Sequence, residues 1–192
     1  MYDGSIVLAS SSPRRAALLA SAGVAFEVRR PDIDETPRPD ESPTEYVSRL
    51  SAEKAAAVAR PGEVVVAADT TVEIDGRILE KPVDAVDARA MLRSLSGRTH
   101  HAHTGVTVVG AGGAHTTVET RVVTTAVTFV ELSDERIEWY VATGEPMDKA
   151  GAYAIQERGA ALVERVEGSV TNVIGLPLAE TLHLLNTART LG

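Results

Sequence analysis

Apolar and polar positions along the chain alternate between short hydrophobic runs and stretches with helical periodicity. The runs at 6–9 and 64–68 are typical of buried strands. Residues 118–130 and 106–109 are rich in threonine and valine and flank a glycine-rich turn at 110–113, which predicts an antiparallel pair with one solvated face. A further strand is predicted at 24–28, a loop at 168–172, and helices at 13–22, 43–60, 84–95, 133–143 and 177–185.

The first apolar run leads directly into a polar loop and a helix start. Ser12 is a suitable N-cap and Pro13 suits the first helical position, where a missing N–H costs nothing. Arg14 and Arg15 then lie at the positive end of the helix dipole, and Ser11 and Ser12 supply hydroxyl donors rather than nucleophiles, because no partnered base is near. This arrangement predicts a phosphate site, and the alternative is an ordinary capped connection with solvated arginines.

A second polar break follows the apolar run at 64–68. Asp69 and Thr70 are expected at the carboxyl end of a central strand, which is where open α/β sheets bind ligands. Asp75-Gly76 then predicts a hairpin turn. An aspartate here either caps a turn or serves in metal binding or as a general base.

One lysine lies on the apolar face of a predicted helix. At helical spacing Lys54 shares a stripe with Val47, Leu50 and Ala57, so its ammonium either reaches the rim or points into a polar cavity. We favour the cavity because the rest of the stripe is apolar.

The loop at 30–43 is acidic and punctuated by prolines. It is either a solvated connection or a lid whose Asp32, Asp34 and Glu35 face a pocket. Ser42-Pro-Thr-Glu45 after it has the pattern of a capping box, which predicts a helix start there.

Three histidines, His100, His101 and His103, follow in a stretch with strand character. His101 and His103 would share one face and could ligate a metal, although nothing local supplies the further ligands that a tetrahedral site needs. A surface strand is the better interpretation.

Composition narrows the class of protein. The 192 residues suit one domain, 1–192, and 44% hydrophobic with 24% charged residues is typical of a soluble globular protein. A net charge of −8 argues against nucleic-acid or acidic-membrane partners. No cysteine is present, which excludes disulfides and thiolate catalysis. Without a signal pattern or an apolar run of membrane length, we expect a cytoplasmic protein.

The segments at 5–19, 63–76 and 144–156 therefore offer the same chemistry, with cations for phosphates and carboxylates for a divalent cation and a water. This combination predicts a triphosphate hydrolase. The cations are Arg14, Arg15, Lys54, Lys81 and Lys149, and the carboxylates are Asp34, Glu35, Asp69 and Asp148.

Several motifs, in order along the chain, resemble the Maf family. They are LASSSPRR at 8–15, AADT at 67–70, EKP at 80–82, MLRSLSG at 91–97, GEPMDKAGAY at 144–153 and GLP at 175–177. The resemblance implies an α/β fold like that of the inosine triphosphate pyrophosphatases, in which a long curved mixed β-sheet flanked by helices forms a central cleft between two lobes. It also implies hydrolysis of a nucleoside triphosphate to the monophosphate and pyrophosphate, a divalent metal cation (Mg²⁺ or Mn²⁺) and a homodimer.

Ile155-Gln156 resembles the branch of the family that acts on dTTP and UTP. By the same resemblance Asp69 is the proton acceptor, Lys54 and Lys81 contact the triphosphate, and Asp34 with Asp69 holds the metal. The positions associated with substrate choice are Arg14, Thr70 and Gln156.

Ala154 and Glu157 stand where many relatives carry glycine, which leaves the base preference open. The alternatives are the same reaction on UTP and CTP or on 7-methyl-GTP, or a non-catalytic nucleotide-binding regulator of septum formation.

Overall fold

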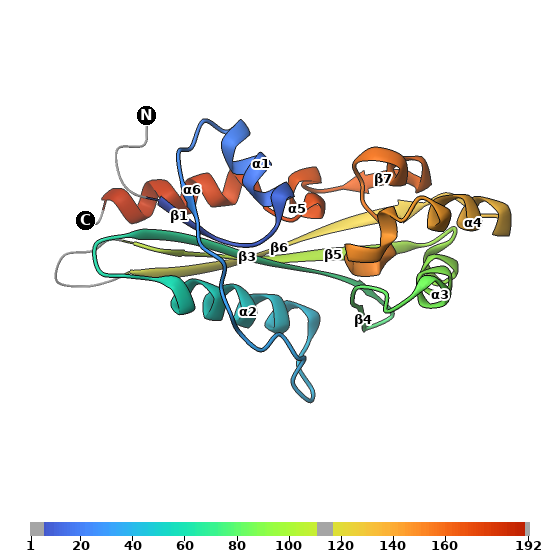
Figure 1. Cartoon of the computed structure of the whole chain (residues 1–192), viewed down its shortest axis with the longest axis horizontal. Coiled ribbons are helices and arrows are strands. Elements are labelled where there is room, and N and C mark those ends of the chain that lie inside the picture. Colours follow the sequence, from blue (N-terminus) through green and yellow to red (C-terminus); the bar gives the residue numbers. More distant parts are fainter. Residues whose placement is uncertain (1–5, 111–116, 191–192) are drawn as a thin grey trace.

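The computed structural model describes residues 6–110 and 117–190, which form a mixed β-sheet with helices on both faces (Figure 1). Its strands are β1 (Ile6–Ala9), β2 (Glu27–Val28), β3 (Val64–Ile74), β4 (Arg77–Leu79), β5 (Thr99–Val109), β6 (Val118–Phe129) and β7 (Val163–Glu167). Its α-helices are α1 (Pro13–Ser21), α2 (Pro43–Val58), α3 (Ala85–Leu95), α4 (Asp134–Ala142), α5 (Val170–Ile174) and α6 (Leu178–Thr190). Three short 3₁₀ segments are η1 (Glu145–Asp148), η2 (Ala150–Ala152) and η3 (Glu157–Leu162).

The strand order is β2-β1-β3-β5-β6-β7, and β4 pairs with β3 outside this path. β1 runs parallel to both of its neighbours, whereas the β3–β4, β3–β5, β5–β6 and β6–β7 pairs are antiparallel. The α/β fold with a mixed sheet is therefore confirmed.

Alternation along the central strands divides the core between the two faces of the sheet. Val7 and Ala9 pack with α2 on one face. Ile6 and Leu8 pack with α1 and α6 on the other. Figure 1 shows α2 on one side of the sheet and α1, α5 and α6 on the other. Both faces of β1 are buried, as its unbroken apolar run predicts.

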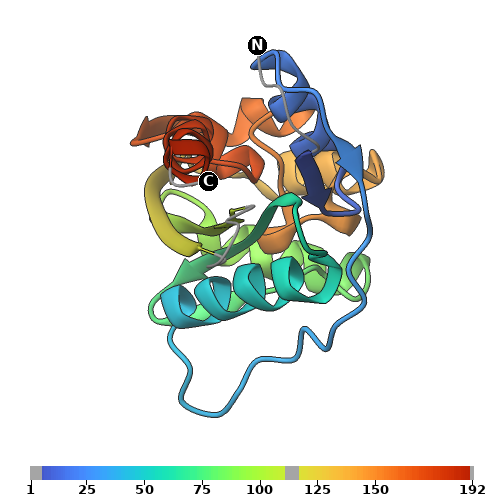
Figure 2. The same cartoon turned by 90° about the vertical axis from the view of Figure 1, so that its left-hand side faces the viewer.

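A separate apolar cluster fills the other end of the sheet, where α3 and α4 lie against the ends of β3–β6. It includes Phe129, Tyr140 and Leu162. In Figure 2 the segment between β2 and α2 runs past the sheet edge and joins the two helical layers. This segment is the acidic loop of the sequence.

Local signals for helix starts are confirmed. Ser12 accepts a hydrogen bond from the Arg15 backbone N–H, and Ser42 with Glu45 forms a reciprocal capping box. The antiparallel pairing of β5 with β6 is also confirmed, and residues 111–113 of the predicted turn lie outside the described residues.

Several local predictions are wrong. β2 covers only Glu27–Val28, and residues 170–174, partly predicted as loop, form α5. Ala57 is exposed, because the buried face of α2 continues through Ala55 and Val58 instead. His100 and His103 are buried, so β5 is not a surface strand at these positions.

Candidate active site

A cavity of about 460 Å³ lies among β3, the start of α1, α2 and the segment that follows α4. Its lining includes all of the residues that the resemblance and the anion-site pattern single out except Asp34. They are Ser11, Ser12, Arg14, Arg15, Lys54, Asp69, Thr70, Lys81, Lys149 and Gln156. Segments far apart in the sequence therefore meet at one pocket.

Asp69 lies within a strand, not at its end as predicted. β3 continues to Ile74 because its backbone stays paired with β5, where Asp69 lies opposite Gly105. The pairing with β1 stops earlier, at Ala9 with Ala67. Asp69 is therefore just beyond the point where β1 leaves the sheet, and the residue is buried and lines the pocket.

Lys54 points into the polar cavity, as predicted. Its Nζ is 2.6 Å from Asp69 Oδ1 and 2.9 Å from a carboxylate oxygen of Glu35. The helix that carries it lies very close to the sheet, since a Cβ on Gly105 would come within 2.2 Å of the Val47 carbonyl oxygen. Glycine at 105 is what lets α2 bring Lys54 up to Asp69.

Arg15, in the first turn of α1, is fixed by two contacts. Its Nε donates to the Gly175 carbonyl at 2.7 Å, and its Nη2 donates to Thr70 Oγ1 at 3.1 Å. Thr70 Oγ1 also lies 2.9 Å from Thr104 Oγ1. Burial lowers the pKa of the Arg15 guanidinium, and the charge of Asp69 opposes that shift. Thr70 thus orients an arginine that faces the pocket.

Arg14 reaches across the pocket to the segment that follows α4. Its Nη1 is 3.5 Å from Asp148 Oδ2, and Lys149 also hydrogen-bonds the Asp148 carboxylate. Burial alone would raise the pKa of Asp148, but these two cations bring it below its usual value. Asp148 therefore holds two cations at the side of the pocket.

The structure does not bring Asp34 into the pocket. Its exposed carboxylate accepts hydrogen bonds from the backbone N–H and the hydroxyl of Thr36, at 2.9 and 2.6 Å, and these bonds lower its pKa. The next residue, Glu35, lines the pocket instead, and its carbonyl accepts a 2.9 Å hydrogen bond from the Tyr46 hydroxyl. Of the three acids that the sequence placed in a possible lid, only Glu35 lines the pocket.

Tyr46 and Tyr153 also line the pocket, and neither was predicted from the sequence to do so. Tyr46 is 6% exposed. Its burial is the main cause that raises the pKa of its phenol, and the negative charge of Asp69 adds to this effect. Tyr153 is 5% exposed and its hydroxyl is 2.8 Å from His100 Nε2. Burial lowers the pKa of His100 to about 4, so this ring is neutral near neutral pH.

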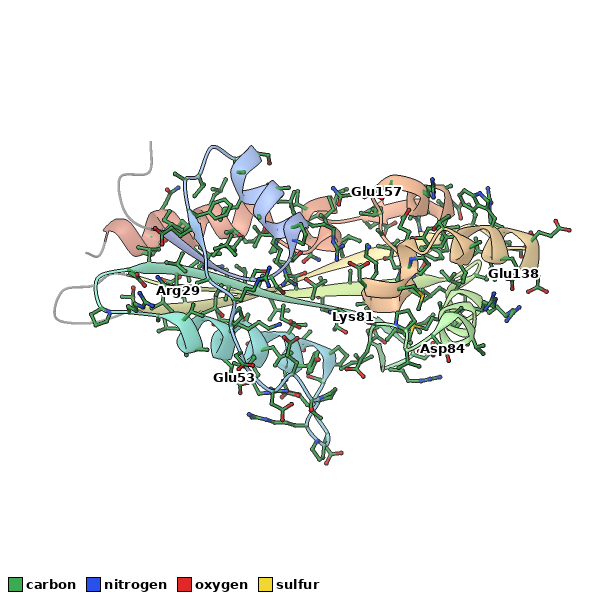
Figure 3. The ribbon with its side chains drawn as sticks, viewed as in Figure 1. Arg29, Glu53, Lys81, Asp84, Glu138 and Glu157 are labelled. Carbon is green, nitrogen blue, oxygen red and sulfur yellow. The ribbon has the colours of Figure 1, made fainter. Side chains whose placement is uncertain are left out.

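Gln156 and Lys81 lie at more open parts of the pocket lining. Both side chains are exposed, and Lys81, which is labelled in Figure 3, follows the end of β4. Among the described residues neither side chain has a hydrogen-bond partner within the protein. Their amide and ammonium groups are thus available to a ligand.

The family model for Maf-like proteins matches residues 5–188 of this chain. The chain belongs to the Maf family. A dTTP/UTP pyrophosphatase from Anaeromyxobacter dehalogenans is 56% identical over 183 residues, which cover 95% of this chain and 93% of that protein. A dTTP/UTP pyrophosphatase from Myxococcus xanthus is 54% identical over 185 residues, covering 95% of this chain and 92% of that protein.

Among solved structures, a HAM1 protein from Coxiella burnetii matches this Maf-family chain with a TM-score of 0.48 and 15% identity. The match covers 96% of this chain and 99% of the HAM1 chain. Within 6–110 and 117–190, no helix of the Maf-family chain is both long enough and apolar enough to cross a membrane.

The pair His101 and His103 of this Maf-family chain has no further carboxylate or histidine that would complete a metal site within the described residues. His101 and His103 share a face of β5 as predicted, with ring centroids 5.9 Å apart, and His103 Nε2 lies 3.7 Å from Glu73 Oε2. In the part of the chain that the structure describes, no group of three His, Cys, Asp or Glu side chains could hold a metal ion.

Proposed function

We propose that this chain is a nucleoside triphosphate pyrophosphatase that hydrolyses dTTP and UTP to the monophosphate and pyrophosphate. The names of relatives that are more than half identical over nearly the whole chain support this substrate class. The observation that carries the proposal is the pocket itself, where Asp69 and several cations from distant segments surround one cavity.

The triphosphate would lie against the cations and hydroxyls of the pocket. Arg15 presents a guanidinium whose position is set by Gly175 and Thr70, and guanidinium groups bind phosphate oxygens in a bidentate manner. Ser11 and Ser12 donate at the start of α1, where the helix dipole also favours an anion. The remaining positive charge would come from Arg14, Lys54, Lys81 and Lys149.

Asp69 would accept the proton of the attacking water. Lys54 holds Oδ1, and no residue in the described ranges hydrogen-bonds Oδ2, which leaves this oxygen to orient a water. The water oxygen bonds to the α-phosphorus as the bond from that phosphorus to the bridging oxygen breaks. The departing pyrophosphate takes the electron pair, and the cations stabilise its charge. No covalent intermediate with the protein is required.

Gln156 would recognise the base through hydrogen bonds. Thymine and uracil present an acceptor, a donor and an acceptor along one edge, and a carboxamide can both donate to and accept from that edge. A base with another pattern would leave the Gln156 amide and the edge of the base without matched partners, which lowers the rate of its reaction.

The carboxylates of this pocket fit a magnesium or manganese ion that also binds the substrate. Asp69 and Glu35 both reach the Lys54 ammonium, so two carboxylates lie close together in the pocket. Mg²⁺ in nucleotide sites commonly binds one or two carboxylates together with phosphate oxygens and water. When bound, the cation would withdraw charge from the phosphates. The homodimer and the cytoplasmic location stay predictions.

A pyrophosphate-release assay with Mg²⁺ and a panel of nucleotides tests the proposal. We expect the highest turnover with dTTP and UTP, and Asp69→Asn should lower kcat by about 10³-fold because proton transfer to a positioned base is lost. Asp75→Asn, in the exposed hairpin turn, is the matched control and should retain activity. Tight nucleotide binding without turnover in the unaltered protein would refute the enzymatic function.

A further inference from the structure

We propose that Glu145 and Tyr140 form a positioning pair that fixes residues 154–159 and thereby sets base selectivity through Gln156. This inference rests on the proposed function of the pocket. Neither residue lines the pocket, and neither belongs to the groups that we propose to bind the phosphates. Their effect would be transmitted through the backbone of one short segment.

Tyr140 holds the beginning of this segment. It is fully buried on α4, and its hydroxyl accepts a hydrogen bond from the Ala154 backbone N–H at 3.1 Å. The same hydroxyl donates to Glu145 Oε1 at 2.9 Å. The phenol therefore links the first residue of the segment to the Glu145 carboxylate.

Glu145 holds the end of the segment with both of its carboxylate oxygens. The Gly159 backbone N–H donates to Oε1 at 3.0 Å, and the Arg158 backbone N–H donates to Oε2 at 3.2 Å. The Glu145 backbone is itself fixed, because its N–H donates to Thr143 Oγ1 at 3.1 Å. One carboxylate thus receives two main-chain donors and one phenol.

The backbone between these two anchors has little freedom. Glu157 has a φ of +58°, which is the left-handed region that side-chain-bearing residues seldom adopt. A Cβ on Gly159 would come within 2.0 Å of the Ala154 carbonyl oxygen and 2.7 Å of the Tyr140 hydroxyl. The segment is therefore closed into a tight loop that the Glu145 and Tyr140 contacts hold.

Gln156 lies at the middle of this loop. It lines the pocket, and in 6–110 and 117–190 no protein group hydrogen-bonds its amide. Its direction must therefore come from the backbone on either side and not from a side-chain contact. Figure 3 labels Glu157, which directly follows it and is exposed.

The phosphate-binding and proton-accepting groups lie on other elements. Asp69 is on β3, Lys54 on α2 and Arg15 on α1, and none of them contacts the Glu145 carboxylate. Of the atoms of Glu145, Lys149 contacts only the backbone carbonyl oxygen, which side-chain substitutions retain. Loss of the pair should therefore alter base recognition and leave the chemistry of the triphosphate in place.

The variants Glu145→Gln and Tyr140→Phe each test one member of the pair. The amide replaces an acceptor with an NH₂ group that would face a main-chain N–H, and the phenylalanine keeps the ring but removes both hydrogen bonds. Glu138→Gln is the matched control, because Glu138 lies on α4 but its carboxylate pairs with Arg89 at the surface (Figure 3). Gln156→Ala serves as the reference for a lost base contact.

We expect kcat/KM for UTP to fall at least about tenfold in both variants, mainly through KM, with kcat/KM for CTP unchanged. Glu138→Gln should match the unaltered protein. If the ratio of kcat/KM for UTP to kcat/KM for CTP stays the same, whether or not both values fall, the proposal is overturned.

Backbone hydrogen exchange in nucleotide-free protein gives a readout that does not depend on activity. Amides at 154–159 should exchange faster in Glu145→Gln and Tyr140→Phe but not in Glu138→Gln, and unchanged exchange would refute the pair. If the unaltered protein hydrolyses no nucleotide, the proposed enzymatic function fails, and the ratio of UTP to CTP affinity by calorimetry still decides the inference.

Discussion

At the scale of single residues, Lys54 and Asp69 form the most consequential contact of the pocket. Their side chains are 7% and 8% exposed, and their charged atoms are 2.6 Å apart. Removing one member of a buried ion pair leaves the other charge without compensation, which costs far more than the pair contributes on balance. The pocket therefore depends on both charges being kept together.

We predict that Lys54→Met lowers the free energy of unfolding by about 3 kcal/mol, measured by urea denaturation. Adding Asp69→Asn should recover most of this loss, because the unpaired carboxylate is then absent. Arg98→Met is the control, since Arg98 pairs with Asp75 at the surface and should cost under about 1 kcal/mol. A double variant that is as unstable as Lys54→Met would contradict this account.

At the scale of elements, α2 carries Lys54, and its start is fixed by the capping box. Ser42 Oγ accepts from the Glu45 backbone N–H, and the Glu45 carboxylate accepts from the Ser42 backbone N–H at 2.9 Å. The acidic loop with Glu35 ends at this cap. The cap thus lies between two elements that each contribute to the pocket, the loop through Glu35 and α2 through Lys54.

Ser42→Ala should lower the free energy of unfolding by about 1 kcal/mol, because the cap hydroxyl then no longer satisfies a first-turn amide. Ser42→Thr retains a hydroxyl that can accept from the Glu45 backbone N–H and donate to the Glu45 carboxylate, so it should lose only a few tenths of this amount. Urea denaturation of the three proteins measures the difference. Equal losses in the two variants would show that the cap contributes nothing.

Local elements were the predictable part of this fold. The helix starts at Ser12 and Ser42 follow from side-chain caps and prolines a few residues away, and the sequence shows them directly. The extension of β3 beyond Asp69 depends instead on pairing with β5, a strand distant in the sequence. Because that pairing does not require apolar residues, the polar break at Asp69 wrongly indicated the end of the strand.

At the scale of the whole molecule, the motifs predicted which segments meet but not every side chain that faces the pocket. The choice of Glu35 over Asp34 depends on where the loop is anchored, through the Tyr46 hydroxyl and the Lys54 ammonium. Likewise, the contacts of Glu145 with 158 and 159 arise from packing of η1 against the start of η3. Neither is visible in the spacing of residue types, because both depend on contacts made only in the folded chain.

A pocket assembled from so many segments should couple them when a nucleotide binds. A ligand that binds only the folded state stabilises it by about 2.7 kcal/mol at a concentration one hundred times its Kd. We predict that a UTP analogue with a non-hydrolysable link between the α- and β-phosphates raises Tm and slows amide exchange around Arg14, Lys54, Asp69 and Gln156 together. Asp75, in the hairpin turn outside the pocket, supplies the internal control and should exchange unchanged. Protection confined to the phosphate-binding segments would mean that the base does not reach Gln156, because each of the four positions reports a different part of one bound molecule.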